Sequence, residues 1–139
     1  MTHYEELVVS ARDAEALAPI VGNLRDAGRF EADAADALAD MLMDARRVPH
    51  DRLPADRVAM NSRVTFRVEP HGDPRTVVLV RPAEANATEG RISVLSPIGR
   101  ALLGRRPGSV SSTDVPGGRA VTIRVLEAER LNDPPLISL

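Results

Sequence analysis

Three carboxylates gather around one predicted turn in the first quarter of the chain. Asp26, Glu31 and Asp33 are the acids there, and Arg29 lies between them. Carboxylate oxygens are hard ligands that suit Mg²⁺, and a metal ion held near a phosphodiester bond can favour its hydrolysis. Because their spacing matches no compact metal-binding motif, a solvated turn is the simpler interpretation and metal-assisted catalysis is the alternative.

Other residue types that commonly do chemistry are scattered or missing. His3, His50 and His71 have no metal-ligand spacing, and the chain has no cysteine, which excludes disulfides and thiolate metal sites. Ser96 has no histidine and aspartate placed by a recognisable motif, so a nucleophilic role is not expected. No glycine-rich phosphate loop is present. The sequence therefore predicts no enzyme and no cofactor.

Charge is distributed unevenly, and the chain has no lysine. Residues 1–55 carry six arginines against eleven acids, a net charge of −5, whereas residues 56–139 carry twelve arginines against nine acids, a net charge of +3. The second balance is too small to indicate direct binding of nucleic acid. Three of these arginines, Arg100, Arg105 and Arg106, are predicted to point into solvent. There they either pair with an acidic patch on a partner or keep the surface soluble.

Residues 1–48 are predicted to form a short antiparallel helical hairpin similar to a coiled coil. Ser10 is the expected N-cap of the first helix, and Gly28 is its expected C-terminal stop. Pro19 lies between them and is expected to kink or break the helix. The second helix is expected over residues 31–47, and each helix should be about 22–25 Å long.

Charged residues follow a pattern along this second helix. Arg46 and Arg47 are expected in its last turn, where cations complement the helix dipole. Asp36, Asp40 and Asp44 form a row on its surface. This row is either a solvated helix face or an electrostatic mimic that acts at the surface of a partner.

A connector punctuated by proline covers residues 49–57 and leads to a segment, residues 58–139, in which the hydrophobic period changes to two. This alternation is typical of strands with one buried face. The predicted strands cover residues 64–68, 76–80, 91–95, 109–115 and 121–125. A turn is expected over residues 116–118, and the tail with Pro134 and Pro135 is expected to be extended.

One short helix interrupts the strands. Ser96 is its expected N-cap, Pro97 takes the first helical position, and Gly104 is the expected stop. Gly99 inside this helix predicts a close approach by another group, since glycine there costs about 1 kcal/mol relative to alanine. Two apolar residues are expected to face the sheet: Ile98 and Leu102. The predicted fold class is α+β, a helical hairpin followed by an antiparallel sheet with one short helix.

Bulk composition limits the possible functions. A chain of 139 residues with 43% hydrophobic residues suits one domain, or one domain and an appendage. Tyr4, Phe30 and Phe66 are the only aromatic residues, which argues against a surface that stacks nucleic-acid bases. No apolar run reaches the length of a membrane span, and the acidic N-terminus does not resemble a signal peptide. A cytoplasmic protein without membrane contact is therefore expected.

Two stretches carry a family resemblance. "ISVLSPIGRALLGRRPGSV" followed by "VPGGRAVTIRVLEAE" resembles the C-terminal domain of the Gre transcript-cleavage factors. "VPHD" and "VAMNSRVTFRV" resemble, more specifically, the Rnk-type regulators of nucleoside diphosphate kinase, and the matching segments run over residues 48–129. The resemblance implies an FKBP-like domain that docks on RNA polymerase beside its secondary channel. Its docking segment corresponds to Ser96, Pro97 and Ile98, whereas Ser109 stands where Gre factors usually carry aspartate.

The hairpin departs from the resemblance. Gre factors use acidic residues at the tip of a long hairpin to help the polymerase hold a second Mg²⁺. Here the tip residues, Asp26, Arg29, Glu31 and Asp33, lack the Asp-x-x-Glu pattern of the family, and the hairpin has only about half the reach. The resulting hypothesis is a regulator that binds RNA polymerase and competes with longer factors without stimulating cleavage.

Two other function classes stay open. The first is a regulator of nucleoside diphosphate kinase and nucleotide metabolism, acting directly or indirectly. The second is an enzyme, either a cleavage stimulator or a prolyl isomerase. Isomerase pockets are lined by aromatic residues, and Phe66 is the only aromatic residue of residues 58–139.

Overall fold

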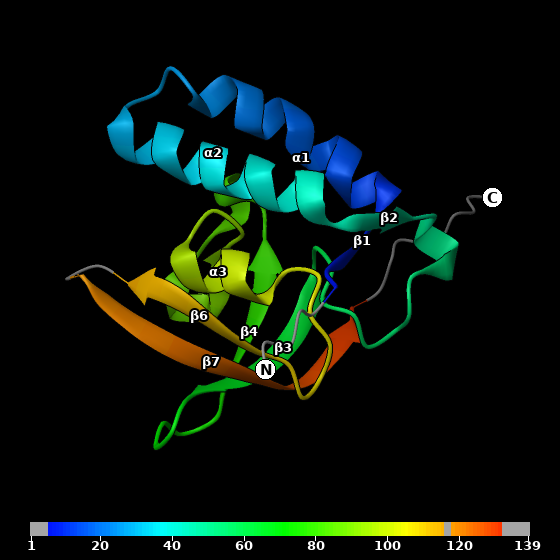
Figure 1. Cartoon of the computed structure of the whole chain (residues 1–139), viewed down its shortest axis with the longest axis vertical. Coiled ribbons are helices and arrows are strands. Elements are labelled where there is room, and N and C mark those ends of the chain that lie inside the picture. The colour runs from blue at the N-terminus through cyan, green and yellow to red at the C-terminus, as the bar shows by residue number, and fades with distance from the viewer. Residues whose placement is uncertain (1–5, 116–117, 132–139) are drawn as a thin grey trace.

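A helical hairpin and a curled five-stranded sheet make up the fold in a computed structural model, which describes residues 6–115 and 118–131. Figure 1 shows the two hairpin helices side by side, along the side of the sheet on which the third helix lies. The hairpin part consists of β1 (Val8–Ser10), α1 (Ala11–Leu24), α2 (Arg29–Asp44) and β2 (Arg46–Val48). The sheet part consists of β3 (Ser62–Val68), β4 (Arg75–Val80), β5 (Arg91–Ser93), α3 (Pro97–Leu102), β6 (Val110–Val115) and β7 (Arg119–Arg130). This architecture confirms the predicted α+β class.

The first helix begins where the sequence predicts. The Ser10 side chain accepts a hydrogen bond from the Asp13 backbone N–H at 3.0 Å, which satisfies one of the free donors of the first turn. The helix continues through Pro19, so it does not break there. Pro19 lies on an exposed part of the helix surface, where a helix tolerates the loss of one backbone donor more easily than in the core. The 14 and 16 residues of α1 and α2 give lengths of about 21 and 24 Å.

Both helices end differently from the prediction. The first ends at Leu24, and Gly28 instead precedes the second helix as its N-cap with a φ of 143°. Arg46 and Arg47 do not lie in a last helical turn, so that prediction is wrong. The backbone becomes extended at Ala45, and the Arg46 N–H donates to the carbonyl of Leu7 at 2.8 Å. A parallel pairing of β1 with β2 therefore replaces the final turn.

The sheet has the order β5-β4-β3-β7-β6, with β3 in the centre. Its pairings are antiparallel except for that of β4 with β5, which is parallel. This differs from the predicted antiparallel sheet because the chain crosses back after β4 through two single-turn 3₁₀ helices, Pro82–Glu84 and Ala87–Glu89, and enters β5 in the same direction. A register shift between Thr65 and Phe66 bends the pairing of β3 with β7.

One continuous hydrophobic core joins the hairpin to the sheet. Its fully buried members come from both parts: Leu17, Leu38, Val64, Phe66, Leu79, Leu102 and Ile123. Because the inner faces of α1 and α2 bury their leucines in this core, the base of the hairpin is held by packing as well as by β1 and β2. The hairpin therefore lies on the domain, and only its tip extends freely into solvent.

Some predictions concern residues that the structure does not describe. Pro116, Gly117 and the tail with Pro134 and Pro135 lie outside the described residues, as do His3 and Tyr4. Among the helices of residues 6–115 and 118–131, none combines the length and apolar character that a membrane span requires.

Candidate partner-docking site

The start of α3 is built by local hydrogen bonds that the sequence predicted. The Ser96 hydroxyl accepts from the Gly99 N–H at 3.0 Å and donates to the Ser93 carbonyl at 2.7 Å, and Pro97 takes the first helical position. Gly99 is needed for space, since a Cβ there would lie 2.0 Å from the Ser93 carbonyl oxygen. The predicted close approach is therefore confirmed, and it comes from the turn between β5 and α3.

An apolar pocket of about 380 Å³ opens beside this segment. Its lining comes from β3, β4, β5, the loop between β4 and β5, and the start of α3: Phe66, Arg75, Val77, Ala85, Ala87, Arg91, Ile92, Ser93, Ser96, Pro97 and Ile98. The three residues of the predicted docking segment thus line the same pocket, together with the fully buried Phe66. Arginines are the only charged residues of the lining. Such a pocket fits an apolar side chain carried by an acidic or neutral segment.

The sequence did not predict this pocket. A short helix with a glycine in its first turn indicates a close contact, but not that a cavity opens next to it. The sequence feature that bears on the pocket is the alternation of side chains in β3, which places Phe66 on the same side of the sheet as the short helix. Recognising it requires knowing that β3, β4 and β5 are adjacent.

The three predicted solvent-facing arginines behave differently. The Arg100 side chain donates from Nη1 to the Leu95 carbonyl, and burial lowers the pKa of its guanidinium below the usual value. The prediction that Arg100 points freely into solvent is therefore wrong, because it satisfies a carbonyl ahead of α3. Arg105 is also half-buried, whereas Arg106 is exposed as predicted. Arg106 is the member of this group best placed to meet an acidic partner.

Ser109 has a local role in the loop after α3. Its hydroxyl accepts from the Arg106 N–H at 3.1 Å and donates to the carbonyl of the same residue. The side chain thus closes a tight turn around Pro107 and Gly108. A serine can close this loop in place of the aspartate usual in Gre factors.

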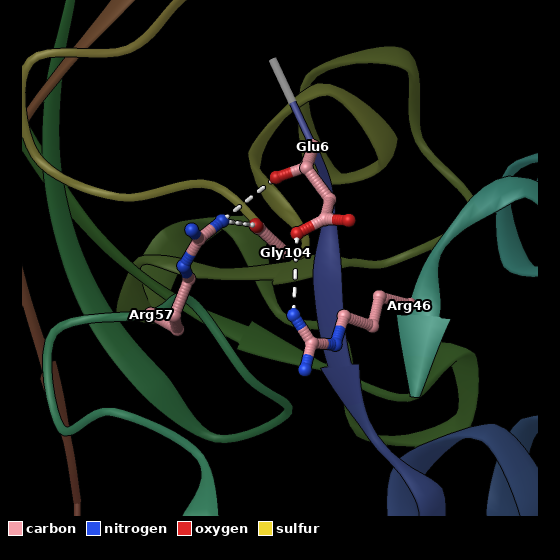
Figure 2. A network of polar contacts seen from close by, with 4 residues as sticks. All are labelled: Glu6, Arg46, Arg57 and Gly104. Atoms are coloured by element: carbon pink, nitrogen blue, oxygen red, sulfur yellow. Dashed lines mark hydrogen bonds and ion pairs between the residues drawn. The ribbon is translucent and has the colours of Figure 1, made fainter. Parts of the chain in front are cut away.

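The end of α3 is bonded to the base of the hairpin (Figure 2). Gly104, with a φ of +80°, is the predicted stop, and its carbonyl accepts from the Val8 N–H at 3.2 Å and from Arg57 Nη1 at 2.9 Å. The same Arg57 nitrogen donates to the Glu6 carbonyl at 2.9 Å. Beside it, the carboxylate of Glu6 pairs with Arg46 of β2 at 3.8 Å. We name this set of contacts the Arg57 joint, since it ties the end of α3 to both arms of the hairpin.

Asp13 provides a second link between hairpin and domain. Its side chain is 6% exposed, accepts from the Met60 N–H at 3.1 Å and also hydrogen-bonds the Ser10 side chain at the N-terminus of its own helix. Burial raises the pKa of Asp13, and the hydrogen bond from Met60 acts in the opposite direction. This contact supports a turn at Asn61, whose φ is +66°.

The hairpin tip presents charged residues to solvent. Asp26, Arg29, Glu31 and Asp33 are all exposed, at the end of α1 and in the first turns of α2. In the part of the chain that the structure describes, no three His, Asp or Glu residues are close enough to hold a metal ion. Asp26, Glu31 and Asp33 therefore do not form a three-ligand cluster of this kind.

The acidic row of α2 is exposed, as a solvated helix face would be. Asp36, Asp40 and Asp44 face solvent, and Asp36 pairs with Arg25 of α1 at 3.6 Å, just below the tip. Sequence reasoning missed one tip residue, Phe30, whose side chain is 88% exposed. The available signal was an aromatic residue two positions after Gly28 that lies outside the apolar stripe of the helix.

Comparisons with known proteins match both parts of the fold. A family model described as "Transcription elongation factor, GreA/GreB, C-term" matches residues 53–130. The "Regulator of nucleoside diphosphate kinase" of Escherichia coli (strain K12) is 37% identical over 123 residues, which is 88% of this chain and 88% of that protein. "Transcription elongation factor GreA" of Geobacillus kaustophilus is 36% identical over 94 residues, 68% of this chain and 60% of that protein.

A solved structure also resembles the whole fold. The "Prokaryotic transcription elongation factor GreA/GreB from Nitrosomonas europaea" superposes with a TM-score of 0.71 and 31% identity, covering 91% of this chain and 99% of that one. The relatives are named as regulators and elongation factors, which confirms the resemblance found in the sequence. The chain belongs to the GreA/GreB transcription elongation factor family.

Proposed function

We propose that the chain is a transcription regulator that binds RNA polymerase beside the secondary channel without stimulating transcript cleavage. It docks through Ser96, Pro97 and Ile98, with Arg106 and the pocket beside α3 adding contacts. In this proposal residues 1–48 form the hairpin, residues 49–57 the connector and residues 58–139 the docking domain. The site of action is the cytoplasm, where the polymerase works.

The observation that carries the proposal is the pocket next to the docking segment. Pro97 and Ile98 line a pocket of about 380 Å³ that Phe66 also lines. An apolar pocket beside a half-buried proline can bind a protein segment, since buried apolar area supplies affinity and the arginines of the lining select charge.

The absence of cleavage stimulation is supported by the tip. Asp26, Glu31 and Asp33 are exposed and do not converge, and the arms are only 14 and 16 residues long. The hairpin therefore occupies the channel entrance and competes with longer factors for the same place.

A pull-down with core RNA polymerase tests the docking edge. Pro97→Ala and Ile98→Ala should each weaken binding, whereas Val110→Ala, at an exposed valine of β6 that does not line the pocket, should bind as the wild type does. Equal binding by all three variants would refute the docking edge.

Adding the wild-type protein to a backtracked elongation complex with Mg²⁺ should produce no shortening of the RNA. Shortening that is lost when Asp26, Glu31 and Asp33 become alanine would refute the non-cleaving role.

A second function is favoured by one relative. The Escherichia coli protein that is 37% identical over 88% of this chain is named a regulator of nucleoside diphosphate kinase. Direct binding to a purified nucleoside diphosphate kinase, unaffected by Ile98→Ala, would favour this function over polymerase docking.

A further inference from the structure

The tip of the hairpin carries an aromatic side chain that contributes nothing to the core. Phe30 is 88% exposed, whereas the other phenylalanine of the chain, Phe66, is 1% exposed and lines the docking pocket. The buried stripe of α2 consists of Ala35, Leu38 and Leu42. Phe30 precedes that stripe by more than a helical turn, so the fold does not use its ring.

The surroundings of this ring indicate the kind of surface it could meet. Asp26, Glu31 and Asp33 are exposed and lie within four residues of Phe30 in the chain, and Arg29 is the one cation among these four tip residues. Within residues 6–115 and 118–131, the tip carboxylates form no ion pair, since the neighbouring Arg25 is engaged with Asp36. A tip with a net charge of −2 repels the phosphates of nucleic acid and attracts a basic protein surface.

We propose that Phe30 is an anchor residue, which inserts into an apolar pocket on a basic protein surface while the surrounding carboxylates meet the basic rim. This inference rests on the proposed function, and the surface is then the wall of the polymerase channel at the depth that the short hairpin reaches. The chain would thus have two contact points, the docking edge of the domain and an aromatic tip. Burying a phenylalanine side chain corresponds to roughly ten- to hundredfold in affinity.

Met43 offers a matched control. Its side chain is 79% exposed and lies on the same helix, near the opposite end from Phe30. Neither Phe30→Ala nor Met43→Ala removes a buried group, so both variants should unfold at the wild-type temperature. The chain has no cysteine, so Ala83→Cys, at an exposed position that does not line the pocket, allows a single fluorophore for anisotropy titrations with core RNA polymerase.

Three results decide the inference. Phe30→Ala should weaken polymerase binding roughly ten- to hundredfold, and Met43→Ala should stay within about twofold of wild type, as surface changes away from a contact do. The double variant Asp26→Lys, Asp33→Lys should also bind more weakly, and most clearly at low salt.

If Phe30→Ala binds like Met43→Ala while Ile98→Ala is impaired, the anchor is refuted and the proposed function stands. Tighter binding by the lysine variant would instead indicate an acidic surface or nucleic acid, and would also refute the anchor. If the wild-type protein does not bind polymerase, both proposals fail together.

Discussion

Replacing Arg57 with alanine should loosen the Arg57 joint between α3 and the hairpin. Arg57 Nη1 donates to the carbonyls of Glu6 and Gly104, both at 2.9 Å, and a hydrogen bond from a charged donor contributes about 1.5–3 kcal/mol. The loss should fall near the low end of that range. The Gly104 carbonyl keeps the Val8 N–H at 3.2 Å as a partner, and the contact at Glu6 is exposed, so water can replace it.

A decrease in unfolding free energy of about 1–2 kcal/mol is therefore expected, which corresponds to a melting temperature roughly 3–8 °C lower. The hairpin should also be held less firmly in one orientation relative to the domain. Nitroxide labels at Ala27→Cys on the hairpin and Ala83→Cys on the domain, both exposed alanines, should report one narrow distance in the wild type. The distance distribution should be broader in Arg57→Ala and partly restored in Arg57→Lys, which keeps one charged donor.

Arg52→Ala is the matched control, because Arg52 is an exposed arginine of the same connector. If Arg57→Ala lowers the melting temperature no more than Arg52→Ala does, the energetic reasoning is wrong. If stability falls but the label distance stays narrow, Arg57 supports the fold without setting the direction of the hairpin.

Two further predictions concern stability. Gly99→Ala should destabilise the protein in urea unfolding despite the better helix propensity of alanine, worth about 1 kcal/mol, because the new Cβ would lie 2.0 Å from the Ser93 carbonyl oxygen and α3 must shift. A gain in stability would show that the turn yields easily. Asp13 has a raised pKa in the folded state, so the folded protein binds its proton more readily than the unfolded chain, and this group disfavours folding as pH rises above about 4. Asp13→Asn, which keeps an oxygen for the Met60 N–H, should remove that decline, as measured by urea unfolding from pH 4 to pH 7. An unchanged pH dependence in Asp13→Asn would show that Asp13 does not cause this decline in stability.

Features that depend on near neighbours in the chain were predictable. Ser10 and Ser96 cap helices because a hydroxyl three residues before a backbone N–H needs no distant partner. Gly104 ends α3 because only glycine adopts its φ without strain. The alternation in β3 and β7 likewise indicates which side chains are buried.

Features that depend on distant groups were not predictable. Arginine is common in the last turn of a helix, but Arg46 lies in a strand. Its N–H donates to the carbonyl of Leu7, just before β1, and β2 pairs with β1. Arg100 is a local case that was also missed: it looks like a surface charge in sequence, but the turn between β5 and α3 brings the carbonyl of Leu95, five residues away, within its reach. The parallel direction of β5 follows from the path of the crossover, which the hydrophobic pattern does not encode.

The candidate site divides in the same way. The sequence alone determined the cap and the stop of α3 and the family, and it predicted Ser96, Pro97 and Ile98 as a docking segment, since these depend on residue types in an uninterrupted string. Only the tertiary structure decided that Phe66, Ile92 and Pro97 enclose a pocket, and that Arg57 ties α3 to the hairpin. The pocket and the joint each bring together residues from separate strands or connectors. How far apart two such residues lie along the chain does not indicate how close they are in the folded protein, because the sheet sets that distance.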